Sequence, residues 1–455
     1  MTTTRFKTES PLISDEQTLC RVFRQGEKPP EKWRIGTEHE LMGFFSQDGR
    51  PVPYAGENGI VTLLEAFGQL GWERMEENGH LIALLKDGAS ITLEPGGQLE
   101  LSGAPLNSVF ETCAEIKGYQ QVLTTLSKTQ GLDWLAVGRN PFFQSDSMPW
   151  MPKERYGIMR NYLPGQGSMA IDMMVGTATV QTNVDYASEA DMARKMRIAT
   201  ALAPVLTALF ANSPFAEGRP SGYLSTRSLV WFHTDPDRSG LVPGVLSGDF
   251  GYRDYLHYAL QVPMFFIHRD DAFVNLAGVP FEDFAKQGYQ GHQANEQDWE
   301  VHLTTLFPIV RLKSYIELRM ADVGPREMIC ALSAISRGLL YDDAAAGEAL
   351  ALVQGVTDEA YVAGQQEAAQ FGLKGNLLGK PLLEWAKEVL AIAEKGLKRL
   401  NVTNSEGQNE AVFLEPLQQI VAEEATLADR MLTLWEGEWN GDLSRLREGS
   451  AWQLK

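Results

Sequence analysis

Cysteine is scarce in this chain of 455 residues: there are three, at Cys20, Cys113 and Cys330. Three cysteines are too few for the disulfide framework of a small secreted domain. No stretch approaches the roughly 20 consecutive apolar residues that span a bilayer, and the opening MTTTRFKTESPLISDEQTL lacks the apolar centre of a secretory signal. We therefore expect a cytoplasmic protein that does not bind membranes.

Positive charge is also in short supply, with 40 Lys and Arg against 59 Asp and Glu, which gives a formal net charge of −19. This balance argues against nucleic acid and anionic membranes as partners, because both require a basic surface. The phosphate-binding motifs G-x-x-x-x-G-K-[ST] and G-x-G-x-x-G are absent. The histidines considered as bases (His39, His233 and His268) lack the spacing of zinc ligands, so we expect them to be structural.

What is present is a mixture of strand and helix patterns. The predicted helices cover about 14–25, 58–72, 106–129 and 188–213, and the predicted strands cover about 33–45, 89–103, 177–187, 223–234, 262–268 and 314–320. After about residue 339 the composition favours helices. These patterns predict an α+β fold, a largely antiparallel sheet with helices on its outer side. We expect one catalytic domain over 1–455, with a core at about 30–340 and a helical C-terminal region at about 341–455.

The first predicted strand, IGTEHELMGF, carries two glutamates on one face. Glu38 and Glu40 lie two residues apart, so their Cα atoms are roughly 7 Å apart on the same side of the strand. Two bare charges 4 Å apart repel by about 4 kcal/mol at an effective dielectric near 20. A divalent cation between the carboxylates would turn this repulsion into attraction.

The segment SITLEPGGQLELS predicts a hairpin with further acids. A three-residue loop at 95–97 pairs Glu94 with Gln98 and Thr92 with Glu100, which places both acids on one face and the leucines on the other. A two-residue Gly-Gly loop would put the acids on opposite faces. Proline, which has no N–H to donate, fits the loop better than a strand ladder. We therefore predict the three-residue loop.

Two more strands continue this polar face. Glu317 and Arg319 share one face of SYIELRMAD, and Gln181 and Asn183, with Thr177, share one face of TATVQTNVDY. Any half-exposed strand can alternate in this way, and that reading stays open for each strand alone. Glutamate is nevertheless depleted in strands, and the first two acidic strands carry no lysine on the same face. Such an all-oxygen cluster suits Mg²⁺ (or Mn²⁺), which usually binds together with phosphates.

Arginines supply the complementary charge. Arg155 is expected in a loop or turn beside aromatic residues, and Arg227 in a strand amid apolar neighbours. An arginine fork matches a carboxylate or a phosphate through two parallel hydrogen bonds. A surface ion pair is the alternative for each, but Arg227 in apolar surroundings needs an anionic partner from the protein or from a ligand.

Several long motifs resemble the plant-type glutamate–cysteine ligases, which also occur in proteobacteria. They include IGTEHE, ITLEPGGQLELSGAPL, RYGIMRNYLPGQGSMAIDMM, TVQTNVDYASEADMARKMR and KSYIELRMAD, and the resemblance covers roughly residues 30–400. It implies the fold of the glutamine synthetase catalytic domain, a curved antiparallel sheet that forms a funnel with helices outside. The leader is too short for a plastid transit peptide, so we expect a bacterial protein.

The resemblance also implies an activity and roles for residues. The enzyme would use ATP to join the γ-carboxylate of glutamate to the amino group of cysteine through γ-glutamyl phosphate, the first step of glutathione biosynthesis. Glu38, Glu94 and Arg319 would be catalytic, and Glu317 with Arg319 would face the ATP phosphates. Substrate carboxylates would be held by Arg155 and Arg227, with Gln181 and Asn183 on the funnel floor. The implied Mg²⁺ ligands are Glu38, Glu40, Glu94, Glu100 and Glu317, and which of them holds which ion is left open.

Cys113 and Cys330 match one of two cysteine pairs that respond to redox state in the plant enzymes. The second pair is missing, with Leu276 at one of its positions. Two buried reduced thiols are the alternative for Cys113 and Cys330. Two other functions remain open: a related ligase that joins glutamate to a different amine, and an inactive regulator that binds nucleotide or metal. We expect small-molecule substrates only, and a monomer or weak homodimer.

Overall fold

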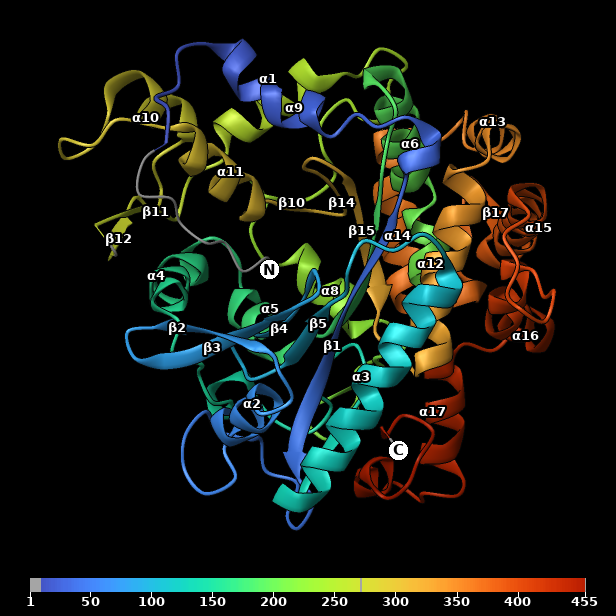
Figure 1. Ribbon diagram of the computed structural model, residues 1–455. Helices are drawn as coiled ribbons and strands as arrows, with labels where there is room; N and C mark the ends of the chain where they lie inside the picture. Colours follow the sequence, from blue (N-terminus) through green and yellow to red (C-terminus); the bar gives the residue numbers. More distant parts are fainter. Residues whose placement is uncertain (1–9, 271, 455) are drawn as a thin grey trace.

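The structure is a computed structural model that describes residues 10–270 and 272–454. An antiparallel sheet of nine strands lies at the centre of the fold (Figure 1). Its strands, in spatial order, are β14 (Val310–Leu312), β15 (Ile316–Asp322), β7 (Thr179–Val184), β1 (Ile35–Phe45), β5 (Leu99–Ser102), β4 (Ala89–Leu93), β3 (His80–Lys86) and β2 (Glu73–Glu77), with β6 (Leu132–Leu135) paired to the second half of β1. Each strand pair in this sheet is antiparallel. The predicted fold class is confirmed.

One face of the sheet packs against helices through apolar side chains. Leu41, Leu93, Leu99 and Leu101 are at most 1% exposed, and full burial of one leucine contributes roughly 1.5–3 kcal/mol. The covering helices are α2 (Ile60–Gly68), α3 (Val109–Gln130), α7 (Ala203–Leu209) and α12 (Arg326–Leu340). The expected apolar backing of the acidic strands is therefore present.

Shorter helices lie over the opposite, polar face, across a pocket described below. They are α4 (Glu154–Tyr162), α5 (Ala170–Gly176) and α8 (Thr226–Phe232). The strand predicted at 223–234 is thus wrong, because most of it forms α8. The Ser225 side chain accepts a hydrogen bond from the Ser228 N–H and starts the helix, so a local cap and tertiary packing outweigh the strand preference of the apolar residues.

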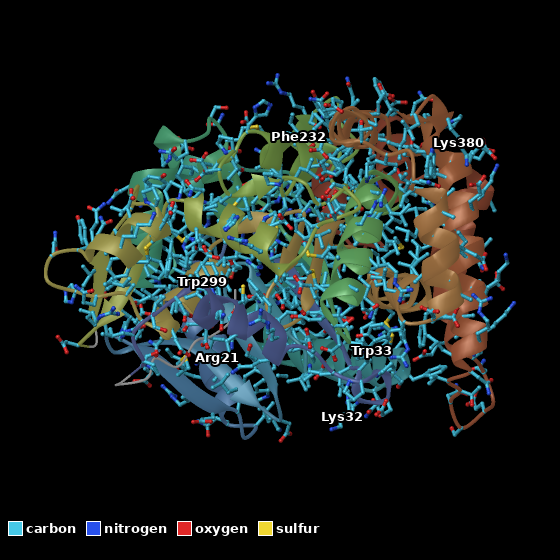
Figure 2. All side chains as sticks on the ribbon, turned by 90° about the horizontal axis from the view of Figure 1, so that it is seen from above. Arg21, Lys32, Trp33, Phe232, Trp299 and Lys380 are labelled. Carbon is cyan, nitrogen blue, oxygen red and sulfur yellow. A yellow bond between two sulfur atoms is a disulfide. The ribbon has the colours of Figure 1, made fainter. Side chains whose placement is uncertain are left out.

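After about residue 340 the chain is mainly helical. Its helices are α13 (Asp343–Leu352), α14 (Asp358–Phe371), α15 (Leu382–Leu400), α16 (Glu415–Glu423) and α17 (Leu427–Glu436). They are drawn in orange to red beside the sheet in Figure 1, and Lys380, just before α15, marks their outer edge in Figure 2. The helices α12 and α15 approach closely at Gly338 and Gly396, where a Cβ on Gly396 would lie 1.9 Å from the Gly338 carbonyl oxygen.

The remaining elements surround the sheet. These are α1 (Glu16–Gln25), α6 (Glu189–Ala201), α9 (Tyr252–Gln261), α10 (Phe281–Gln287) and α11 (Glu296–Thr304), with the two-stranded pairs β8 (Phe215–Ala216) and β9 (Arg219–Pro220), β10 (Ser239–Gly240) and β13 (Phe307–Pro308), β11 (Phe266–Arg269) and β12 (Ala272–Asn275), and β16 (Asn376–Leu377) and β17 (Lys380–Pro381). Arg21 of α1 and Trp299 of α11 lie close together in Figure 2, and the Trp299 indole donates to the Leu19 carbonyl at 3.0 Å. The helix predicted at 188–213 is divided into α6 and α7 near Pro204.

A disulfide joins Cys113 of α3 to Cys330 of α12, with their Cα atoms 5.7 Å apart, and Cys20 is a buried free thiol. The bond connects two helices that both contact β1. Among the residues described, no helix is both long and apolar enough to cross a membrane.

Candidate active site

The polar face of the sheet gathers the predicted side chains from neighbouring strands. The register places Glu38 of β1 opposite Gln181 of β7 and Glu40 opposite Glu100 of β5. On the other side of β7, Glu317 of β15 lies opposite Asn183. Residues far apart in the sequence therefore share one polar surface across β15, β7, β1 and β5.

The hairpin between β4 and β5 has the predicted three-residue loop. The Glu94 N–H donates to the Gln98 carbonyl at 2.9 Å, and the Gly97 N–H donates to the Glu94 carbonyl at 2.9 Å. Gly97 adopts a φ of 88°, which favours glycine. Thr92 lies opposite Glu100 and donates to its carboxylate at 2.7 Å, so both acids share the polar face.

Four carboxylates form what we call the acidic side: Glu38 and Glu40 on β1, Glu94 directly after β4, and Glu100 on β5. Burial, together with the charges of Glu94 and Glu100, holds the pKa of Glu40 well above its usual range. Burial and the charges of Glu317 and Glu100 likewise raise the pKa of Glu38. Like charges directly opposite each other in a sheet are destabilising. A bound cation would offset this cost.

At the other end of this face lies what we call the cationic side. It consists of Arg311 and Lys313 of the β14–β15 hairpin, with Glu317 and Arg319 of β15. Glu317 is fully buried, forms an ion pair with Arg311, and lies 3.7 Å from Lys313 and 3.3 Å from Arg319. Burial alone would raise the pKa of Glu317, but these three cations hold it well below its usual range. Glu317 therefore has its counterions within the protein.

A pocket of about 530 Å³ lies between this face and the helices α4, α5 and α8. It is lined by five of the predicted residues, Glu40, Glu94, Gln181, Arg227 and Arg319. Arg319 donates to the side chains of Gln181 and Glu317. The pocket lining thus combines two carboxylates with two guanidinium groups.

Arg227 enters the pocket from α8 and not from a strand, which corrects the prediction for its element. Its side chain is 3% exposed, donates to the Arg319 carbonyl at 2.9 Å and lies 4.0 Å from the Asp322 carboxylate. The Arg227 Nε and the Trp231 Nε1, both buried, have no hydrogen-bond partner among the described residues. Burial lowers the pKa of Arg227 to about 10, so the guanidinium keeps its charge at neutral pH.

The other predicted residues lie outside the lining of this pocket: Glu38, Glu100, Glu317, Asn183 and Arg155. Asn183 donates to Glu38 at 2.9 Å and so orients that carboxylate. Arg155 is on α4, where a loop or turn had been expected. Thr177 follows α5 and does not belong to β7.

Some residues of the site were missed at the sequence level. Arg311 and Lys313 alternate in VRLKSY, and a hairpin register from that segment to β15 would have placed Arg311 opposite Glu317. Trp231 and Met173 also line the pocket and were not among the predicted site residues. Lys153 is buried and donates to the Leu93 carbonyl at 2.7 Å, and burial with the nearby Arg155 lowers its pKa to about 7. The single lysine that begins KERYG gave no signal of this environment.

The donor set fits a hard divalent cation that also binds phosphates. Within residues 10–270 and 272–454, no three His, Cys, Asp or Glu side chains are grouped so that they alone could hold a metal ion. Mg²⁺, however, is usually held by one or two carboxylates together with waters and substrate phosphates. Burial and the neighbouring carboxylates raise the pKa values of Glu38 and Glu40, and a divalent cation would offset this repulsion.

Comparison with known proteins shows the family. Residues 34–449 match the profile of glutamate–cysteine ligase family 2. The chain belongs to this family. It is 41% identical to the chloroplastic glutamate–cysteine ligases of Nicotiana tabacum and Arabidopsis thaliana, over 95% of this chain and 83% of each relative. The protein is therefore an enzyme of a ligase family, and membership supports a role at the first step of glutathione biosynthesis.

A solved structure shares the fold at low sequence identity. The glutamate–cysteine ligase of Francisella tularensis, solved in complex with AMP, superposes with a TM-score of 0.56 at 13% identity, over 93% of this chain and 89% of that one. The expectation of a bacterial cytoplasmic protein is contradicted, because the plant relatives are named as chloroplastic enzymes.

Proposed function

We propose that this ligase joins the γ-carboxylate of glutamate to the amino group of cysteine, with ATP converted to ADP and phosphate. Support comes from the family, from relatives named glutamate–cysteine ligase, and from a structural neighbour that binds AMP. The substrates are an amino acid with two carboxylates, an amino acid that supplies an amine, and a nucleotide. The pocket contains charged groups that suit the first of these substrates, the amino acid with two carboxylates.

One observation carries the proposal: two buried donors without partners line the pocket opposite two carboxylates. The Arg227 Nε and Trp231 Nε1 would donate to a substrate carboxylate, and the Glu40 and Glu94 wall would attract an ammonium group or a metal ion. A guanidinium binds a carboxylate through charge-assisted hydrogen bonds. Met173 and Phe307 flank these groups, which suits the methylene chain of glutamate.

The reaction needs the γ-carboxylate to gain a leaving group. One of its oxygens attacks the γ-phosphorus of ATP, and ADP leaves. The cysteine amine then attacks the acyl carbon of γ-glutamyl phosphate, loses a proton and expels phosphate. Mg²⁺, when bound, would neutralise the phosphates and hold them for in-line transfer. Glu38, Glu40, Glu94 and Glu100 are the residues that would hold it, whereas Glu317 already has Arg311, Lys313 and Arg319 around it.

The protein's own cations also act on the transferred group. Arg319 lines the pocket from the same sheet face as Glu40 and is oriented by Gln181 and Glu317. Its charge would stabilise the phosphoryl group in transit, because a donor that is fixed beforehand needs no reorganisation during the reaction. Arg227 would keep glutamate in place meanwhile.

An assay of ADP release tests the function. We expect release only when Mg²⁺, ATP, glutamate and cysteine are all present, and none after chelation by EDTA. Full release without cysteine, or a much faster rate with another amine in a panel of amino acids, would overturn the assignment of the acceptor.

A pair of arginine variants tests the pocket. Arg227→Gln should raise the KM for glutamate about 10–100-fold, because a hydrogen bond to a charged group is worth about 1.5–3 kcal/mol. Arg160→Gln is the matched control, since Arg160 is exposed and stacks on Trp150 at 4.3 Å. An unchanged KM in Arg227→Gln would remove Arg227 from the glutamate site.

A further inference from the structure

The segment Ser450–Leu454 extends the central sheet at the edge of β6. The Ala136 N–H donates to the Trp452 carbonyl and the Leu454 N–H donates to the Trp134 carbonyl, both at 2.9 Å. Gln453 pairs with Leu135 in antiparallel register. The Trp452 side chain is 4% exposed. This segment is therefore packed into the fold beside the strand that pairs with β1.

The Trp452 indole ends on a buried amide. Its Nε1 donates to the Asn212 Oδ1 at 2.8 Å, and Asn212 is fully buried. The Asn212 side-chain nitrogen donates in turn to the carbonyls of Ala136 at 3.0 Å and Val323 at 2.7 Å. Because both N–H donors and the oxygen of the Asn212 amide are hydrogen-bonded, three segments of the chain fix its orientation.

The same asparagine reaches the carboxylate behind Arg227. Its backbone N–H donates to Asp322 at 3.0 Å, and Asp322 also accepts from the hydroxyls of Ser213 at 2.6 Å and Ser225 at 2.9 Å. The Ser213 hydroxyl accepts from the Arg227 backbone N–H at 3.1 Å. Asp322 lies 4.0 Å from the Arg227 guanidinium. Arg227 is therefore held at both its backbone and its charged end by one buried cluster.

Space around this cluster is tightly filled. A Cβ on Gly138 would lie 2.4 Å from the Asp322 carboxyl carbon, and the Gly138 N–H donates to the Asn212 carbonyl at 3.1 Å. Asp322 consequently cannot shift towards Gly138, and its position depends on the groups that donate to it. Loss of one of them leaves a buried polar atom without its partner, which costs more than the bond itself contributes.

We propose that Trp452 is a positioning residue for the substrate pocket, acting through Asn212 and Asp322 on the guanidinium of Arg227. The inference rests on the proposed function, in which Arg227 holds a glutamate carboxylate. No residue of the segment 450–454 lines the pocket, and in this proposal its effect on glutamate passes through the buried cluster.

The variant Trp452→Phe keeps an aromatic ring and removes the donor to Asn212. We expect the KM for glutamate to rise 3–10-fold, with the KM for ATP and kcat within twofold of wild type. Trp439→Phe is the matched control, because its ring lies 6.4 Å from that of Trp452 in the same region, and it should leave all three constants unchanged. A lower melting temperature for Trp452→Phe with a wild-type KM for glutamate would overturn the proposal.

A double-variant cycle with Asp322→Asn checks the route. If Trp452 acts through Asp322, Trp452→Phe should change the KM for glutamate less than twofold in the Asp322→Asn background, and additive effects would contradict this. Should Trp452→Phe fail to fold, Ser225→Ala removes another donor to Asp322 and should give the same rise in KM. If ADP release by the wild-type protein did not depend on glutamate and cysteine, the proposed function would be refuted instead.

Discussion

The acidic and cationic sides of one sheet face solve the same electrostatic problem in opposite ways. On the cationic side, Glu317 is buried with Arg311, Lys313 and Arg319 around it. On the acidic side, Glu40 lies opposite Glu100 and beside Glu94, with burial and these charges raising its pKa. The carboxylate of the first arrangement is stabilised by three cations of the protein, whereas the facing carboxylates of the second repel each other, a repulsion that a bound cation or a proton would relieve.

This difference separates residues that serve folding from residues that serve a ligand. A buried carboxylate with its own counterions behaves as a structural ion pair, and removal of one partner is costly. A buried cluster of like charges lowers stability until something binds. Functional sites commonly carry such perturbed groups. The variants below should therefore have opposite effects on stability at the two sides.

The largest effect is expected at the cationic side. Glu317→Gln should lower the free energy of unfolding by about 3–5 kcal/mol, because it leaves Arg311 and its neighbours without a buried counterion. Chemical denaturation at pH 7.5 without metal measures this. Stability equal to wild type would show that the ion pairs are not structural.

Loss of turnover should follow substitutions on the acidic side. Glu38→Gln and Glu94→Gln should each reduce ADP release by about 10²–10³-fold, as removal of a preorganised electrostatic group does in other enzymes. The fold should persist, as judged by circular dichroism. Glu76→Gln, an exposed residue on β2, is the control with normal activity. Near-normal turnover in either acidic-side variant would remove that residue from the proposed metal site.

A smaller effect of opposite sign is expected for Glu40→Gln without metal. Its free energy of unfolding should exceed that of wild type by about 1–3 kcal/mol near pH 8, since one unit of pKa shift corresponds to about 1.4 kcal/mol. The folded-state pKa of Glu40 lies above the usual 4.5, so wild type loses stability as pH rises through the folded value. The advantage of Glu40→Gln should therefore shrink as pH falls through that value.

Glu317→Gln should show the reverse pH dependence. The folded-state pKa of Glu317 lies below 4.5, so the stability it provides is present above 4.5 and is lost only as pH falls further. Denaturation curves from pH 8 to pH 4 compare the two variants. A parallel pH dependence for both would contradict the distinction between the two sides.

Much of this face could be predicted because strand alternation is local. The faces of Glu38 and Glu40 and the loop at Pro95–Gly97 follow from residue spacing and turn chemistry, and the structure agrees. The juxtaposition of Glu40 with Glu100 could not be derived in this way, since the register between β1 and β5 depends on long-range pairing.

Arg227 shows where local preference fails. The apolar residues around it are typical of a strand, yet the Ser225 cap and packing over the pocket produce helix α8. Its chemistry was anticipated, because an arginine in apolar surroundings requires an anion, whereas its element and its anchoring by Asp322 were not. The cluster that includes Trp452 and Asn212 joins segments 240 residues apart and leaves no mark in sequence spacing.

The central claim is that the acidic side takes up a divalent cation. Calorimetric titration of Mn²⁺ into wild type, Glu40→Gln and Glu76→Gln, each with a non-hydrolysable ATP analogue, measures this directly. We predict that wild type and Glu76→Gln bind with equal affinity and that Glu40→Gln binds at least about tenfold more weakly, a difference of about 1.4 kcal/mol. Equal affinity in all three proteins would contradict the claim.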